Sequence, residues 1–563
     1  MTSTSHAPHF KELLVIGDIL DPRSGQRYEA MLVRSSKIVD VGSRAKFDFA
    51  GMERADLTGQ GTIVPGFVDA HSHLQTGSRV LGLNISVHTP PADCIDDIVA
   101  ILQQAAASEA GSQRWIEAQG NLGQNYRLTD KRYPNRHDLD RVSTDRPIIV
   151  RFGAHVWAFN SVALNELGID RNVVLPNPAH VEVDEAGEPT GIVNDLVMVE
   201  SQMPSMAIPG PAEGSFGAAL VKTATDYFTA RGVTTIGEMT DGIDSLSSLR
   251  EAILSDDVVL RVKLYALDSV VRELVSAGTA PSVLGLDDSR LEHRLMLGGY
   301  KLAADGGISA REAAVWEPYA DRAGYIGQLG LSPGEVERLV EKAEKQGLQV
   351  LVHAAGDRAM DFALDEFERA AGKLESRDGR PSWNSTHRIE HLGNVFATDE
   401  RLKRSRELDV LPVVNIGFLF GIGDSMAGVL GEDFATKPLY RLRTLLDLGF
   451  PAVGSSDFAG GLPEVSNPLL LMRVAQDRTT FGGVVLGEDQ ALSPIEALRS
   501  VTVDAAAALD MEGLIGEFSP GALADFVLLS SDPLAAQPDE LGDGTVRVLE
   551  TWLGGKRVWW ADS

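Results

Sequence analysis

Two histidines separated by one residue close an apolar run near the start of the chain. His71 and His73 follow Ile63 to Ala70, a β-rich stretch with one Pro-Gly pair. In a strand, residues i and i+2 project to the same face, so both imidazoles can leave one buried strand together. Two neutral imidazoles on one rigid element make half of a metal site. The alternative is a chance His-x-His in a loop, and ligands elsewhere in the chain decide between the two.

Other side chains that bind metals follow apolar runs later in the chain. His353 ends the run that starts at Val350, His391 ends the run that starts at Arg388, and Asp457 follows Val453-Gly-Ser-Ser. A lone histidine at a strand end is more often structural than a ligand. Two of them on consecutive strands, facing a His-x-His, favour ligands. Buried carboxylates are seldom without a cation or a hydrogen-bond donor, which places Asp457 in the same set.

Lys301 lies in the apolar stretch Gly298-Gly-Tyr-Lys-Leu-Ala-Ala-Asp. A lysine in a buried strand is costly unless it is paired or modified. Carbamylation by carbon dioxide would turn it into a carboxylate that can bridge two metal ions. The alternative is a lysine that reaches solvent or pairs with Asp305.

Four imidazoles and two oxygen-bearing groups suit zinc or a similar divalent ion, one or two per chain. A bridging carboxylate would hold two ions about 3.5–4 Å apart, and a shared water would then ionise near neutral pH and act as the nucleophile. Asp457 would bind one ion, take the proton of that water and pass it to a leaving nitrogen. Without carbamylation of Lys301 the site would hold one ion, and the same mechanism would still operate.

The elements that must position these residues alternate strand and helix, which favours a parallel α/β architecture. Eight core strands are expected, the number that a (β/α)₈ TIM barrel needs. Most of the candidate ligands fall at or just past the carboxyl ends of these strands, where such barrels place their chemistry. The expected strands are Ile63–Asp69, Val233–Gly237, Leu260–Ala266, Gly298–Leu302, Gln349–His353, Arg388–His391, Leu411–Val414 and Ala452–Gly454.

Short β-rich runs at both ends of the chain predict a small β-sandwich built from residues 1–60 and 515–563; two unrelated hairpins are the alternative. The hydrolase barrel is then expected over residues 61–514. The first two barrel strands lie too far apart for a βα unit, which predicts an inserted α/β subdomain at about residues 75–230. Residues 417–438, rich in Gly, Phe and Asp, are expected to form a mobile loop over the site.

Composition excludes several classes of protein. The 563 residues carry a net charge of −29, and no basic run is present, so we expect no nucleic-acid partner. Cys94 is the single cysteine, which excludes an intramolecular disulfide and a cysteine-rich metal site. No apolar run approaches the roughly 18 residues of a membrane span, and the N-terminus lacks an apolar signal core. We expect a cytoplasmic protein without a membrane anchor.

The motif Pro65-Gly-Phe-Val-Asp-Ala-His-Ser-His resembles the signature of the metal-dependent amidohydrolase superfamily. The late segments Gly513-Leu-Ile-Gly-Glu and Pro520-Gly-Ala-Leu-Ala-Asp-Phe-Val are similar to that superfamily's return into its small β-domain. Finer motifs resemble amidohydrolase family 3, whose members include N-substituted formamide deformylases. They are Trp115-Ile, Ala154-His-Val-Trp-Ala-Phe-Asn-Ser, Gly187-Glu-Pro-Thr-Gly, Asp305-Gly, Glu317-Pro-Tyr-Ala-Asp, His353-Ala-Ala-Gly-Asp and Arg388-Ile-Glu-His.

The resemblance covers essentially the whole chain and implies a barrel with a β-sandwich that hydrolyses C–N bonds. By position, His71 and His73 match the histidines of the first metal, and Lys301 matches the bridging carbamylated lysine (an N6-carboxylated lysine). His353 and His391 match the histidines of the second metal, and Asp457 matches the catalytic aspartate. The segment Ala304-Asp-Gly-Gly departs from the family, which often has an aromatic residue and a serine there; this removes no ligand. A homo-oligomer is an expectation from the family.

Weaker predictions concern residues around the ligands. His155, Trp157 and Asn160 are expected to line the substrate pocket, with a structural role in the insertion as the alternative. Asp305, Asp357 and Glu390 are expected to stand behind the ligands and to orient Lys301 and the histidines.

The sequence thus predicts a metal-dependent hydrolase that cleaves an amide-type C–N bond, N-acyl, N-formyl or cyclic, in a small molecule. A deaminase or a decarboxylase on the same metal site is the alternative among enzymes, because a fold does not determine a reaction. A non-catalytic binding module is the alternative outside enzymes. Loss of metal ligands would favour such a module, and all six are present.

Overall fold

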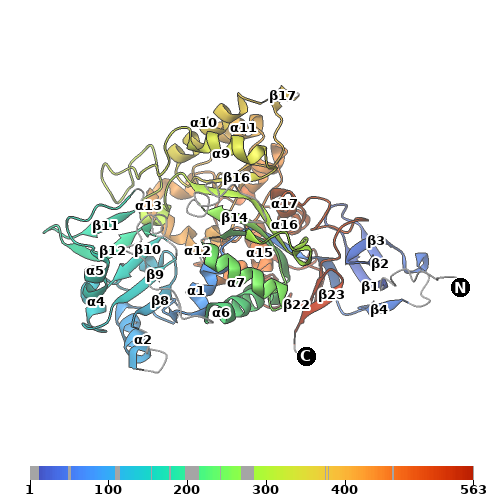
Figure 1. The fold of residues 1–563 in the computed structure, drawn as a ribbon, viewed down its shortest axis with the longest axis horizontal. Coiled ribbons are helices and arrows are strands. Elements are labelled where there is room, and N and C mark those ends of the chain that lie inside the picture. Colours follow the sequence, from blue (N-terminus) through green and yellow to red (C-terminus); the bar gives the residue numbers. More distant parts are fainter. Residues whose placement is uncertain are drawn as a thin grey trace.

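The computed structural model describes residues 12–47, 52–89, 91–107, 114–153, 155–176, 179–196, 215–240, 242–267, 284–374, 376–377, 379–459 and 462–561. Three large sheets organise these residues: a central parallel sheet, a sheet in the insertion, and a sheet made from both chain ends (Figure 1). Over the described ranges, no helix is both long and apolar enough to cross a membrane.

The central sheet is parallel, in the order β20-β19-β16-β15-β14-β13-β6. Isolated parallel bridges join Val414 to Gly454 and Ser72 to Phe458, so residues 454–458 link β20 back to β6. Seven of the eight predicted barrel strands therefore have a counterpart in this sheet, whereas the predicted strand Ala452–Gly454 contributes only an isolated bridge, and the sheet is TIM-barrel-like. Its strands are β6 (Phe67–Ser72), β13 (Val233–Thr240), β14 (Arg261–Leu267), β15 (Leu295–Ala303), β16 (Gln349–His353), β19 (Arg388–Glu390) and β20 (Leu411–Val413).

The first predicted barrel strand, Ile63–Asp69, is divided between two sheets, which corrects the prediction of one continuous strand. β5 (Thr62–Pro65) belongs to the terminal sheet, and β6 begins at Phe67. Gly66 lies between the two strands, where the chain passes from the terminal sheet to the central sheet. A Cβ at this position would lie 2.2 Å from Oγ1 of Thr234. Only glycine allows so close an approach to the neighbouring strand.

Strands from both ends of the chain share the terminal sheet, in the order β23-β22-β21-β5-β1-β2-β3 with β4 beside β1. They lie at the right of Figure 1. The predicted union of the two ends is confirmed by this pairing, whereas a two-layered sandwich stays a prediction. The strands are β1 (Glu12–Leu20), β2 (Arg27–Arg34), β3 (Lys37–Gly42), β4 (Glu53–Asp56), β21 (Phe526–Leu529), β22 (Val548–Leu553) and β23 (Lys556–Trp560).

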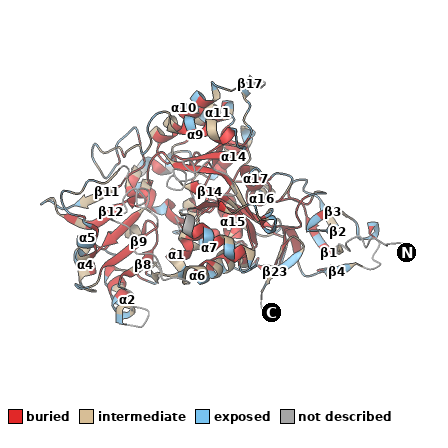
Figure 2. Ribbon diagram, in the orientation of Figure 1, coloured by how far each residue is buried: buried red, intermediate tan, exposed pale blue. Residues whose placement is uncertain are grey.

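The insertion carries its own mixed sheet, in the order β11-β12-β10-β9-β8-β7, seen at the left of Figure 1. Apolar side chains alternate along β9 and β10, so one set packs towards α2 and the other towards α5, and these two strands are largely buried (Figure 2). The exact domain boundaries stay a prediction. The elements are β7 (Ile85–Ser86), α2 (Ile95–Ala107), β8 (Ile116–Gly120), α3 (Gln124–Arg127), α4 (Arg136–Asp140), β9 (Ile148–Phe152), β10 (Val156–Phe159), α5 (Ser161–Leu167), β11 (His180–Val183) and β12 (Pro189–Asn194).

The predicted loop over residues 417–438 is mainly helical, which corrects the prediction. α12 (Gly417–Ile422) and α13 (Met426–Leu430) bury Leu419, Ile422, Met426 and Val429, and this burial explains why the segment folds. The remaining helices are α1 (Leu74–Gly82), α6 (Ser215–Thr223), α7 (Ile243–Leu254), α9 (Glu335–Glu344), α10 (Asp357–Ala371), α11 (Asp399–Glu407), α14 (Leu442–Asp447), α15 (Pro468–Asp477), α16 (Pro494–Ser500) and α17 (Val503–Ala508).

Candidate metal centre

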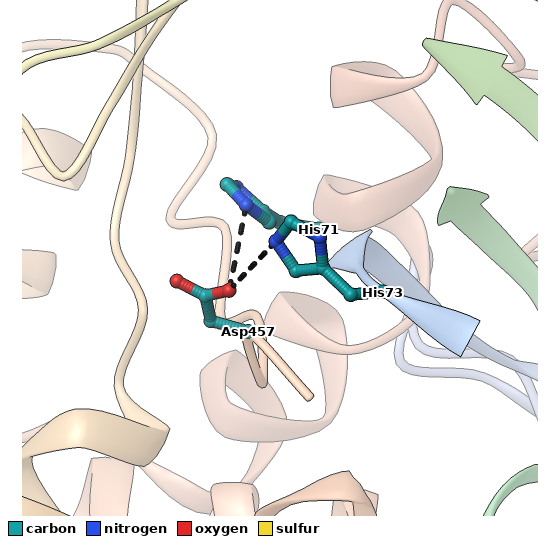
Figure 3. Close-up of side chains that lie close together, drawn as sticks. All are labelled: His71, His73 and Asp457. Carbon is teal, nitrogen blue, oxygen red and sulfur yellow. Dashed lines mark ion pairs between the residues drawn. The ribbon is translucent and has the colours of Figure 1, made fainter. Parts of the chain in front are cut away.

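Three side chains meet at one end of the central sheet. His71 lies in β6, His73 precedes the first residue of α1, and Asp457 follows the bridged residue Gly454. Nε2 of His73 lies 3.2 Å from Oδ1 of Asp457, and Nε2 of His71 lies 3.5 Å from the same oxygen (Figure 3). One donor atom from each of the three residues lies within 4.8 Å of the others.

These distances fit a divalent ion. In a tetrahedral zinc site with metal–ligand distances of about 2.0–2.2 Å, neighbouring ligand atoms lie about 3.4 Å apart. The two nitrogen–oxygen distances, 3.2 and 3.5 Å, fall on either side of that value. Imidazole nitrogen and carboxylate oxygen are also donor types that zinc accepts. The three residues therefore fit a metal ion by geometry and by chemistry.

Glu390 holds the ring of His71. Oε2 of Glu390 lies 2.5 Å from Nδ1 of His71, and Oε1 accepts a hydrogen bond of 2.7 Å from Nε of Arg388. Burial raises the pKa of the Glu390 carboxyl, but Arg388, His71 and Lys301 outweigh that effect and hold the pKa well below its usual range. The ionised carboxylate can only accept, so Nδ1 of His71 carries the hydrogen. Nε2 is then left with a lone pair towards Asp457.

His353 and His391 form a second pair beside the first. His353 is the last residue of β16, His391 follows β19, and their ring centres are 4.4 Å apart. The ring centre of His391 lies 5.6 Å from that of His71, and its Nε2 lies 3.9 Å from Oδ2 of Asp457. The four predicted histidines are thus brought together, as parallel strand ends require.

Lys301 lies in β15, next to β16, and its side chain is 4% exposed. This burial removes the alternative of a lysine that reaches solvent. The carboxylate of Asp305 instead accepts hydrogen bonds from the backbone N–H groups of Ala314, Ala355 and Gly356. Burial lowers the pKa of Lys301 to about 8, although Glu390 and Asp457 oppose the shift.

The buried histidines are neutral near pH 7, as metal ligands must be. Burial lowers the pKa of His391 to about 3, and burial together with His391 and Lys301 brings the pKa of His353 well below its usual value. Burial raises the pKa of Asp457, but His71, His73 and His391 outweigh it and keep the pKa well below the usual range. Asp457 is therefore an ionised carboxylate beside the histidines.

The backbone at two of these residues is in the left-handed region, where non-glycine residues are uncommon: φ is 71° at His391 and 52° at Asp457. Hydrogen bonds hold both positions, from N of His391 to O of Val413 and from N of Asp457 to O of His71. Such strained residues gather at functional sites, where the surrounding structure determines them.

Asp69 and Glu238 also support the site, and sequence reasoning missed both. Asp69 accepts hydrogen bonds from the backbone N–H of Ser456 and from its hydroxyl, directly before Asp457. Burial raises the pKa of Asp69 to about 6. Asp69 precedes His71 by two residues on the same strand, so the i, i+2 alternation could have found it. Glu238, at the end of β13, accepts from the N–H groups of Leu74 and Gln75 and so caps α1.

His155 faces the metal centre from the insertion. Its ring centre lies 6.3 Å from that of His353, and its Nδ1 is hydrogen-bonded to Oδ1 of Asp195. Burial lowers the pKa of His155, but the carboxylates of Asp195, Asp457 and Asp305 outweigh it and raise the pKa above its usual value. Asp195 was not predicted, because the two residues are forty positions apart and meet only through strand pairing.

The other predicted pocket residues have contacts elsewhere. Trp157 packs in the insertion core with Phe159 and the helix α5. Asn160 caps α5: its Oδ1 accepts from N of Ala163 and Ile148, and its Nδ2 donates to two backbone carbonyls. Asp357 accepts from N of Trp316, in the loop after β15. Substrate contact by Trp157 and Asn160, and an orienting role for Asp357, stay predictions.

A TIM-barrel-like parallel sheet that gathers four histidines, a buried lysine and an aspartate at its strand ends presents the donor types of a divalent-metal site. Residues 55–559 match the profile of the Amidohydrolase family, and the chain belongs to that family.

Relatives span nearly the whole chain. Protein LONG AFTER FAR-RED 3 of Arabidopsis thaliana is 28% identical over 94% of this chain and 88% of its own length. N-substituted formamide deformylase of Arthrobacter pascens is 26% identical over 94% of each chain. The crystal structure of an uncharacterized metal-dependent hydrolase from Pyrococcus horikoshii OT3 superposes with a TM-score of 0.71 at 24% identity, covering 94% of this chain and 100% of that one.

Proposed function

We propose that the protein is a metal-dependent hydrolase that cleaves an amide-type C–N bond, N-acyl, N-formyl or cyclic, in a small molecule. The observation that carries the proposal is the convergence of Nε2 of His71 and Nε2 of His73 on Oδ1 of Asp457 at tetrahedral spacing. Membership of the amidohydrolase family and similarity to an N-substituted formamide deformylase support the reaction class.

His71, His73 and Asp457 would hold one divalent ion, for which zinc is our first choice. His353 and His391, with Lys301 as an N6-carboxylated bridge, would hold a second. The lowered pKa of Lys301 supports the bridge, because only the neutral amine adds to carbon dioxide. A bound ion supplies Lewis acidity, which activates water as the nucleophile and polarises the amide carbonyl.

Side chains of the protein would then carry out the proton transfers and hold the ligands in place. Asp457 is ionised, so its carboxylate can accept the proton of the attacking water and return it to the leaving nitrogen. Glu390 would keep His71 in the tautomer that binds metal, and Asp305 would fix the segment behind His353 through three backbone N–H groups. The burial of these side chains keeps bulk water from competing with them.

Metal content tests the site. Protein purified without chelator should hold about two equivalents of zinc by elemental mass spectrometry, and Lys301→Ala should hold one or fewer. Lys403→Ala, an exposed lysine on α11, should match the wild type. One equivalent of zinc in both the wild type and Lys301→Ala would contradict the proposal that Lys301 bridges two ions. A protein that binds no metal even after reconstitution would contradict the hydrolase proposal.

Product analysis tests the reaction. The zinc-loaded protein should convert N-formyl or N-acyl amides to a carboxylate and an amine, and His73→Ala should abolish turnover together with metal at that position. Release of ammonia from an aminated substrate would instead indicate a deaminase, and release of carbon dioxide a decarboxylase.

A further inference from the structure

The sheet of the insertion brings His155 and Asp195 together at the edge of the metal centre. Val156 of β10 pairs with Asn194 of β12, so the next residues outward, His155 and Asp195, lie opposite each other. The N–H of Asp195 donates to the carbonyl of His155 at 2.7 Å, and the side chains are joined by the bond from Nδ1 of His155 to Oδ1 of Asp195. The pair is therefore held by both backbone and side chains.

The backbone of the barrel makes room for this pair. A Cβ at Gly307 would lie 2.8 Å from Cγ of His155, and a Cβ at Gly306 would lie 2.5 Å from Oδ2 of Asp195. Both contacts are closer than real Cβ atoms allow, so the two glycines after Asp305 are required by the position of the pair.

Burial makes the pair costly unless it has a function. Asp195 is completely buried, its φ is 51°, and its Oδ2 has no hydrogen-bond partner among the described residues. An unsatisfied buried carboxylate oxygen costs free energy, and such cost and strain persist at functional sites. His155 keeps 15% of its side chain exposed, and its ring lies beside that of His353.

We propose that His155 hydrogen-bonds the scissile amide group of the substrate through Nε2, and that Asp195 is a positioning residue that acts through His155. This inference rests on the proposed function. Asp195 occupies Nδ1, which leaves Nε2 as the ring nitrogen available to a ligand. The insertion thereby supplies a contact to the substrate from a position beside His353 of β16, and links the inserted sheet to the reaction.

Acetohydroxamate, which carries an amide group and binds zinc, is a probe that does not depend on turnover. Its dissociation constant for the zinc-reconstituted protein is measured by calorimetry. We expect His155→Ala to weaken binding about tenfold, the effect of one lost hydrogen bond. His155→Gln should recover part of that loss, and His137→Ala, an exposed histidine of the same insertion, should bind as the wild type does.

Two further variants test how the pair works. Asp195→Asn should weaken acetohydroxamate binding in the wild type but cause no further loss in the His155→Ala background, because Asp195 acts only through His155. Gly307→Ala should behave in the same way, since its φ of −81° suits alanine and only the ring of His155 is displaced. A purely structural role would instead lower thermal stability equally in both backgrounds.

The outcomes separate this inference from the proposed function. Equal acetohydroxamate affinity of wild type and His155→Ala, with full zinc in both, would overturn the role of His155 and leave the metal site intact. Additive losses in the double variants would overturn the role of Asp195. A wild type that takes up no zinc would overturn the metal centre and, with it, the contact that depends on it.

Discussion

At the residue scale, the metal centre depends on which nitrogen of each imidazole carries the hydrogen. In the proposed metal site, His71 would bind through Nε2, because an ionised carboxylate, Glu390, holds its Nδ1–H. Glu390 is in turn neutralised by Arg388, and both side chains are completely buried. Because Arg388 keeps Glu390 ionised, Glu390 can only accept a hydrogen bond, and His71 takes the tautomer with its hydrogen on Nδ1.

Glu390→Gln should weaken zinc binding about ten- to a hundredfold, because the amide can donate to Nδ1 and stabilise the tautomer that cannot bind. Arg388 keeps the carbonyls of Ala508 and Ala70 as acceptors, so the variant should fold. Zinc affinity is measured by competition with a chromophoric chelator, and circular dichroism checks the fold. The exposed Glu185→Gln is the control. Unchanged zinc affinity in Glu390→Gln would mean that Glu390 does not select the tautomer.

At the element scale, the turn from β6 into α1 is held by the neighbouring strand rather than by itself. His73 precedes α1 but offers the helix no side-chain cap. Glu238 of β13 fills that role with hydrogen bonds of 2.6 and 2.9 Å to N of Leu74 and of Gln75. A carboxylate at a helix N-terminus satisfies free N–H groups and matches the positive end of the helix dipole. The capped N–H groups come directly after His73 in the chain, so the cap fixes the backbone next to it.

Glu238→Gln should lower the free energy of unfolding by about 1.5–3 kcal/mol, the value of a hydrogen bond to a charged group. Urea denaturation of the metal-free protein measures this loss, and Glu251→Gln, exposed on α7, provides the baseline. Zinc affinity should fall as well, because His73 loses its fixed backbone. A variant as stable as the wild type would show that α1 does not need this cap.

At the scale of the whole molecule, a buried ion pair joins the barrel to the sheet made from the chain ends. Arg261 of β14 donates two hydrogen bonds to Asp525, of 2.6 and 2.8 Å, and both side chains are almost fully buried. Asp525 also accepts from N of Gly554, between β22 and β23. The C-terminal strands are thereby tied to the sheet that carries Lys301 and the histidines.

Arg261→Met should cost about 3–5 kcal/mol of unfolding free energy, because it leaves Asp525 as an unpaired buried charge. The double variant Arg261→Met/Asp525→Leu should recover much of that loss, since no charge is then buried without a partner. Urea denaturation of the two variants and the wild type makes the comparison. If the double variant were less stable than Arg261→Met, the loss of stability in Arg261→Met could not be attributed to an unpaired buried charge on Asp525.

The sequence by itself determined which side chains are the candidate metal ligands and at which edge of the sheet they gather. Parallel strands bring their carboxyl ends to one edge, so histidines and an aspartate that follow apolar runs had to gather there, whatever lies between them. The same reasoning located the barrel strands and the pairing of the two chain ends, because hydrophobic periodicity is a local property.

Only the tertiary structure decided the remainder, because it depends on contacts between segments that have no local signal. The pairing of His155 with Asp195 comes from the register of β10 and β12, and a shift of one residue would separate them. The break at Gly66 comes from the close approach of Thr234, and the helices of residues 417–438 form because their apolar faces find a core. The positions of Glu238 and Glu390 likewise follow from neighbouring strands.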